Sequence, residues 1–168
     1  MKRLMLMRHA KSDWDAAYAS DHDRPLSGRG RESAVAMGIV LARAGLAPDL
    51  AISSSAVRAR TTVELAAEAG SWTATIEVSP ALYGTSPDAA LDVASRSADG
   101  VDSLMLVGHE PTWSDLVHHL TGARVNVKTA TVVGIELPGD TWRHVGDARG
   151  ALEFVLQPRM FAEGWDLT

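Results

Sequence analysis

Two arginines and two histidines stand just after short apolar runs, and these residue types can bind and transfer a phosphoryl group. They are, in chain order, Arg8, His9, Arg58 and His109. A short apolar run bounded by polar residues is typical of a buried strand, and open α/β sheets hold their ligands at the carboxyl ends of the strands. A guanidinium holds phosphate oxygens in a bidentate fork, and an imidazole can attack phosphorus. The pattern therefore predicts an anion site that contains a nucleophile.

Four segments of the chain match a known family in the order in which the family has them. They are residues 6–12 (LMRHAKS), 23–27 (DRPLS), 54–59 (SSAVRA) and 107–111 (VGHEP). On these segments the chain resembles branch 1 of the histidine phosphatase superfamily, the phosphoglycerate mutase-like group, and within it the small SixA-type phosphohistidine phosphatases. The resemblance implies a phosphatase that works through a phosphohistidine enzyme intermediate.

The resemblance and the side-chain chemistry assign a role to each of the four residues. His9 is the expected nucleophile, because a neutral imidazole can attack phosphorus when its other ring N–H is held by a backbone acceptor. Arg8 and Arg58 are expected to contact the non-bridging oxygens, and His109, protonated by an anionic neighbour, completes a cationic pocket. Without the resemblance, a lone histidine is more often a structural residue.

The family pattern also selects among residues that chemistry alone does not separate. By residue type Arg60 is as good a candidate as Arg58, and the family spacing selects Arg58. A helix begins there, and its free N–H groups favour anions. Ser12 matches the first family motif, so it is expected among the phosphate-binding residues.

The first segment departs from the mutase-type members, which read Arg-His-Gly-Glu-Ser-x-Trp-Asn. Lys11 replaces the glutamate and either adds a positive charge at the mouth of the pocket or is a solvated loop lysine. Asp15 stands where an asparagine touches phosphate. Because a carboxylate repels a phosphate dianion, Asp15 is not expected to be a direct ligand.

The residues after the third strand lack the glutamate that protonates the leaving oxygen in mutases and many phosphatases of the family. Residues 79–88 contain one carboxylate, Asp88, which has an adequate structural role in the first turn of a helix. Asp88 is therefore only a weak candidate for the general acid. An imidazole that leaves from phosphohistidine depends less on such an acid than an alkoxide does.

Three functions are compatible with these residues. The first is a metal-independent phosphatase that acts on protein phosphohistidine. The second is a phosphomonoesterase or mutase for a small metabolite, against which stand the short chain and the missing glutamate. The third is an inactive module that binds phosphoproteins, for which a retained nucleophile has no use. The first is preferred.

Composition is that of one ordinary globular domain spanning residues 1–168. The chain has 46% hydrophobic and 22% charged residues, no cysteine and a net charge of −5. It therefore predicts no disulfide, no thiolate chemistry and no general attraction to nucleic acid or to an anionic membrane. The first apolar stretch is too short for a signal peptide or a membrane span, so we expect a cytoplasmic protein. We also expect a monomer.

No cofactor or metal ion is expected. Histidine and aspartate alternate in residues 21–23, but the resemblance makes this segment a loop that leads into the first helix. His118 and His119 are adjacent on a helix and point to different sides, so they cannot chelate one ion together.

Alternating apolar runs and helical patterns predict a three-layer α/β/α sandwich with a mostly parallel central sheet of about six strands, similar to phosphoglycerate mutase. Strands are expected near residues 3–7, 50–53, 75–78, 104–108, 132–137 and 152–156. Helices are expected from the cap Ser27 to Gly45, over residues 57–69, from Pro87, and over residues 112–120. The first helix turns residues 34, 35, 37, 38, 40 and 41 inward, and a turn at residues 138–140 predicts a closing antiparallel hairpin.

Overall fold

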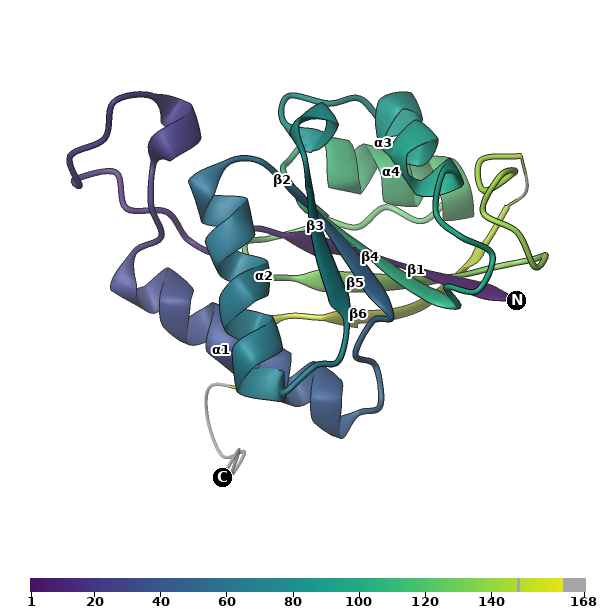
Figure 1. Ribbon diagram of the computed structural model, residues 1–168, viewed down its shortest axis with the longest axis horizontal. Coiled ribbons are helices and arrows are strands. Elements are labelled where there is room, and N and C mark those ends of the chain that lie inside the picture. The colour runs from purple at the N-terminus through teal and green to yellow at the C-terminus, as the bar shows by residue number, and fades with distance from the viewer. Residues whose placement is uncertain (148, 162–168) are drawn as a thin grey trace.

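A computed structural model describes residues 1–147 and 149–161 and contains a six-stranded mixed sheet (Figure 1). The strands are β1 (Lys2–Arg8), β2 (Leu50–Ser54), β3 (Thr75–Ser79), β4 (Ser103–Gly108), β5 (Val132–Leu137) and β6 (Ala151–Leu156), and their order in the sheet is β3-β2-β4-β1-β5-β6. Strands β3, β2, β4 and β1 are parallel, whereas β5 is antiparallel to β1 and to β6. The carboxyl ends of β1, β2 and β4 therefore meet at one edge.

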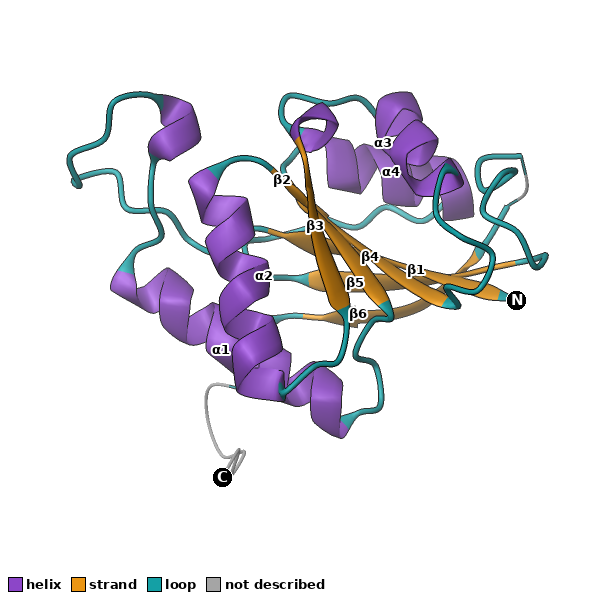
Figure 2. Cartoon of the chain, in the orientation of Figure 1, coloured by secondary structure: helices purple, strands orange, loops and turns teal. Residues whose placement is uncertain are grey.

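Two helices cover each face of the sheet (Figure 2). Helices α1 (Gly28–Arg43) and α2 (Val57–Gly70) lie on one face, and α3 (Pro87–Ser95) and α4 (Thr112–Thr121) lie on the other. The predicted three-layer, mostly parallel fold is confirmed. Among the described residues, the helices are too short or too polar to traverse a bilayer.

Strand β1 shows why a continuous apolar run forms the centre of this sheet. Leu4 and Leu6 pack into the core under α3 and α4, while Met5 and Met7 pack into the core under α1 and α2. Successive side chains of a strand point to opposite faces, so a strand covered on both sides is apolar at every position. Arg8, at the carboxyl end of the strand, is the first polar side chain after this apolar run.

The expected boundaries hold within about two residues, with three corrections. Val35 is only half-buried, because the inner stripe of α1 passes to one side of it. Helix α2 includes Gly70, and Ser71 takes the left-handed conformation, with φ 51°, that ends the helix. Strands β5 and β6 are antiparallel as predicted, but the turn at residues 138–140 does not join them directly, because β6 begins only at Ala151.

Candidate active site

The sheet register brings the two histidines together. Arg8 of β1 pairs with Gly108 of β4, so His9 and His109 leave adjacent parallel strands at the same level. The backbone N–H of His9 donates to the Gly108 carbonyl at 3.0 Å. The two imidazole rings lie with their centroids 5.1 Å apart.

His9 is held as a neutral imidazole with one unprotonated nitrogen. Its Nδ1 lies 2.7 Å from the carbonyl oxygen of Ala10, which can only accept, so Nδ1 carries the proton. Its Nε2 keeps a lone pair, toward which Nε of Arg58 donates at 3.4 Å. Burial, followed by the nearby positive charges, lowers the pKa of His9 to about 3. The ring is therefore neutral and nucleophilic at pH 7.

Arg58 is the buried cation of the cluster, with 5% of its surface exposed, whereas Arg60 is exposed. The first turn of α2 carries it, and the hydroxyl of Thr62 joins this turn to the loop after His9. That hydroxyl donates to the Arg58 carbonyl at 2.6 Å and accepts from the Ala10 N–H at 3.0 Å. These bonds set the position of the Arg58 guanidinium relative to His9.

Arg8 is half-buried and incompletely paired. Its Nη1 donates to the carbonyl of Val127 at 3.0 Å, but its Nε is buried and has no hydrogen-bond partner among the described residues. Buried N–H groups in proteins are nearly always satisfied. An anionic oxygen next to His9 would satisfy this one with a charge-assisted bond.

His109 differs from its expected protonation state. Burial, followed by the charge of Arg58, lowers the pKa of His109 to about 4, so the ring is neutral at pH 7 in this structure. Its Nε2 lies 2.8 Å from the Ser54 hydroxyl, and its Nδ1 lies 3.5 Å from Nη2 of Arg58. The nearby carboxylate of Asp21 does raise the pKa of His109, but by less than burial and Arg58 lower it.

Asp21 is a site residue that the sequence did not reveal. Its carboxylate accepts hydrogen bonds from Arg24 at 2.9 Å, from Arg58 at 3.1 Å and from the Tyr83 hydroxyl at 3.1 Å. Its carbonyl oxygen accepts a further bond from Arg58 at 2.7 Å. The hydrogen bond from Arg24 is the main reason that the pKa of Asp21 falls to about 2. Asp21 therefore holds Arg58 through both its carboxylate and its backbone carbonyl.

The remaining candidates lie outside this hydrogen-bonded cluster. Ser12 is buried, and its backbone forms an isolated bridge with Leu26. Lys11 and Asp15 are exposed on the loop after β1. Asp88 is exposed in the first turn of α3, and in the described part of the chain no hydrogen bond or ion pair joins it to the four residues.

Comparisons with known proteins agree with this geometry. Residues 4–84 match the family model of the histidine phosphatase superfamily (branch 1). An uncharacterized chloroplastic protein of Arabidopsis thaliana is 31% identical over 153 residues, which cover 84% of this chain and 69% of that protein. An uncharacterized protein of Mycobacterium tuberculosis is 44% identical over 112 residues, 66% of each chain. The chain thus spans about two thirds of the length of these relatives.

Solved structures share the fold over nearly the whole chain. A protein assigned as the phosphohistidine phosphatase SixA of Nakamurella multipartitia superposes with a TM-score of 0.81 at 27% identity, covering 94% of this chain and 96% of that one.

Proposed function

Because the chain belongs to branch 1 of the histidine phosphatase superfamily, we propose that it hydrolyses protein phosphohistidine through a phosphohistidine formed on its own His9. The family and the fold support a phosphatase. One observation carries the proposed mechanism: the Ala10 carbonyl holds Nδ1–H of His9, so that Nε2 offers its lone pair beside Arg58.

In the first step, Nε2 of His9 attacks phosphorus, a new N–P bond forms, and the bond from phosphorus to the substrate imidazole breaks. The leaving imidazole takes a proton from water, and the hydroxide left behind is neutralised by a proton that the phosphate product releases after the second step. Arg8 and Arg58 stabilise the charge on the non-bridging oxygens, which is the main demand of phosphoryl transfer. In the second step, water attacks the phosphohistidine, inorganic phosphate leaves, and neutral His9 is restored.

The acid-base state of the site supports a phosphohistidine substrate over an alkyl phosphate. Asp21, the carboxylate bonded to Arg58, has a pKa of about 2 and is ionised at neutral pH, so it does not donate a proton. The carboxylate of Glu110 accepts hydrogen bonds from the Ser114 N–H and hydroxyl, so both of its oxygens are engaged within its own segment. A described site whose bonded carboxylate, Asp21, is ionised suits a substrate with a good leaving group.

Labelling of His9 tests the mechanism. Incubation with a ³²P-labelled phosphohistidine protein is expected to give an acid-labile, base-stable phosphoenzyme, and His9→Ala should give neither label nor turnover. The matched control is His118→Ala, which alters an exposed histidine of α4 and should behave as wild type. Normal labelling and turnover in His9→Ala would exclude His9 as the nucleophile.

A further inference from the structure

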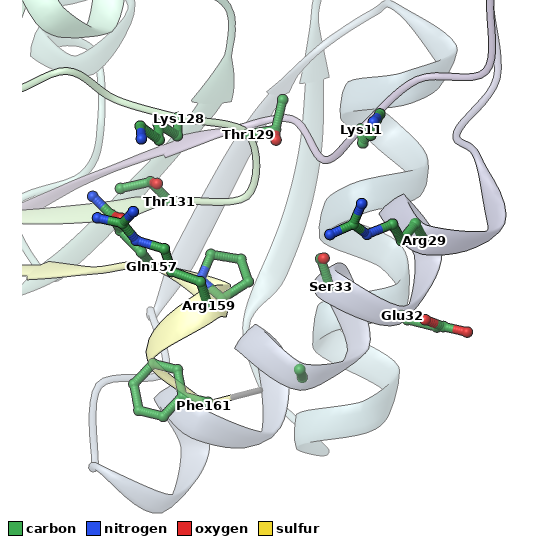
Figure 3. A pocket seen from close by; sticks show the side chains of 12 residues that line it. Lys11, Arg29, Glu32, Ser33, Lys128, Thr129, Thr131, Gln157, Arg159 and Phe161 are labelled. Carbon is green, nitrogen blue, oxygen red and sulfur yellow. The ribbon is translucent and has the colours of Figure 1, made fainter. Parts of the chain in front are cut away.

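A positively charged groove of about 600 Å³ lies between α1 and the segments before β5 and after β6 (Figure 3). Four cationic side chains line it. Lys128 and Arg159 stand on the strand side of the groove, and Lys11 and Arg29 stand on the side of α1. We call this surface the basic groove.

Segments that line the basic groove are joined to the backbone of His9 by the chain and by hydrogen bonds. Lys11 follows His9 by two positions in the chain. On the other side, the N–H of Ala130, two residues after Lys128, donates to the carbonyls of Arg8 and His9 at 3.1 and 3.2 Å. The groove therefore lies at the same edge of the sheet as His9, so one protein partner can reach both.

The charges of the groove are unbalanced. The chain as a whole carries a net charge of −5, yet the groove has four cations and a single carboxylate, Glu32, which Figure 3 shows pointing away from Lys128 and Arg159. In the described part of the chain none of the four cations forms an ion pair. Clustered like charges repel one another, and a bound anion relieves this repulsion.

A buried hydroxyl provides a second observation. Thr131 also lines the groove, its side chain is 0% exposed, and its Oγ1 has no hydrogen-bond partner among the described residues. Figure 3 places it on the strand side, between Lys128 and Gln157. A buried hydroxyl without a partner costs free energy. An anionic oxygen in the groove would accept a hydrogen bond from this hydroxyl.

We propose that the basic groove binds an acidic segment of the phosphorylated partner protein while the partner's phosphohistidine occupies the site at His9. This inference rests on the proposed function and names the kind of partner. A phosphate site such as that at Arg58 uses a buried guanidinium, whereas all four cations of the groove are on residues that are exposed and come from separate segments. Exposed, spread charges recognise an extended acidic surface.

Two synthetic phosphohistidine peptides test the proposal. One carries four glutamates beside the phosphohistidine, and the other carries four glutamines. Wild type at low ionic strength is expected to show a KM about tenfold lower for the acidic peptide at equal kcat, since several exposed ion pairs contribute together. The preference should shrink as salt is added. Equal KM values for the two peptides would overturn the inference.

Charge-reversal variants locate the effect. Lys128→Glu with Arg159→Glu should abolish the preference, and the milder Lys128→Gln with Arg159→Gln should reduce it. The control, Arg96→Glu with Arg143→Glu, changes the net charge equally at exposed positions outside the groove and should keep the preference. Loss of the preference in the control as well would show that net charge, and not the groove, is responsible.

A small substrate separates this inference from the proposed function. Phosphoramidate is too small to reach the groove, so wild type and all of these variants should hydrolyse it at the same rate. If wild type hydrolyses neither phosphoramidate nor the peptides, the proposed function fails. If phosphoramidate turnover is normal and the peptides are not distinguished, only the basic groove proposal fails. Loss of phosphoramidate turnover in both groove variants would also overturn it, by making the groove part of the reaction site.

Discussion

Four basic side chains share one partly buried cluster, and burial together with their mutual repulsion decides which of them carry charge. Arginine remains protonated because its ordinary pKa is far above neutral. The histidines are neutral at pH 7 instead, with pKa values of about 3 for His9 and about 4 for His109. Burial is the largest cause in both cases, and the arginine charges add to it. The same surroundings that attract a phosphoryl dianion therefore keep the nucleophile unprotonated.

These pKa values predict how stability depends on pH. Below the ordinary pKa of 6.5, the unfolded state takes up a proton on His9 that the folded state refuses until pH is about 3, so the free energy of unfolding falls as pH decreases through that range. Between pH 7 and pH 5 the loss from His9 is about 2 kcal/mol. Urea unfolding at both pH values should show a smaller loss in His9→Gln than in wild type. Equal losses would contradict the lowered pKa.

The lack of a glutamate in residues 79–88 predicts a steep dependence of the rate on the leaving group. General acid catalysis contributes about a hundredfold to ten-thousandfold, so turnover of phosphoramidates and aryl phosphates should exceed that of alkyl phosphates such as phosphoglycerate by about that factor. Asp88→Asn should leave turnover of activated substrates nearly unchanged. The measurement is kcat/KM for phosphoramidate, p-nitrophenyl phosphate and a panel of sugar phosphates. Equal rates on alkyl and aryl esters, or loss of alkyl turnover in Asp88→Asn, would reveal an acid and favour a small-metabolite phosphatase.

At the level of elements, the contact between α1 and α2 sets the position of Arg58. The two helices approach so closely that a Cβ atom on Gly38 would lie 2.0 Å from the carbonyl oxygen of Ala66. A Cβ atom on Gly70 would lie 2.4 Å from the carbonyl oxygen of Gly38. Both obstacles are backbone atoms, which cannot rotate aside as a side chain can. Glycine at these positions lets α2 lie where its first turn delivers Arg58 to His9.

Gly38→Ala is therefore expected to destabilise the protein and to weaken catalysis. Overpacking of a filled interior costs about 1 to 3 kcal/mol, and a shift of α2 should lower kcat/KM because Arg58 moves with it. Urea unfolding and phosphoramidate turnover measure the two effects. Gly28→Ala is the control, since a Cβ atom there has no neighbour within 4 Å, and it should match wild type. Unchanged stability in Gly38→Ala would show that the helices separate without cost.

At the scale of the whole molecule, positive charge is gathered at one edge of an acidic protein. Net charge is −5, yet Arg8 and Arg58 flank His9 at the carboxyl end of the parallel strands. Fixed guanidinium groups can perform the charge stabilisation that a metal ion performs in other phosphatases. Turnover of phosphoramidate should therefore persist in excess EDTA. Loss of activity in EDTA, with recovery on addition of a divalent ion, would contradict this prediction.

The sequence by itself predicted the elements and selected four candidate site residues. Apolar runs, caps and turns are local signals, so they predicted all six strands and four helices, and the family motifs selected Arg8, His9, Arg58 and His109. The placement of Arg58 and not Arg60 in the cluster agrees with that selection.

Only the tertiary structure decided what surrounds these residues. The hydrogen bond from Tyr83 to Asp21 joins residues 62 positions apart, and the basic groove combines Lys11 with Arg159. No local sequence pattern predicts such pairs, because each pair depends on how segments that are distant in the chain meet in space. The protonation state of His109 depends likewise on burial and on the balance of nearby charges. The burial and the arrangement of charges exist only after the chain has packed.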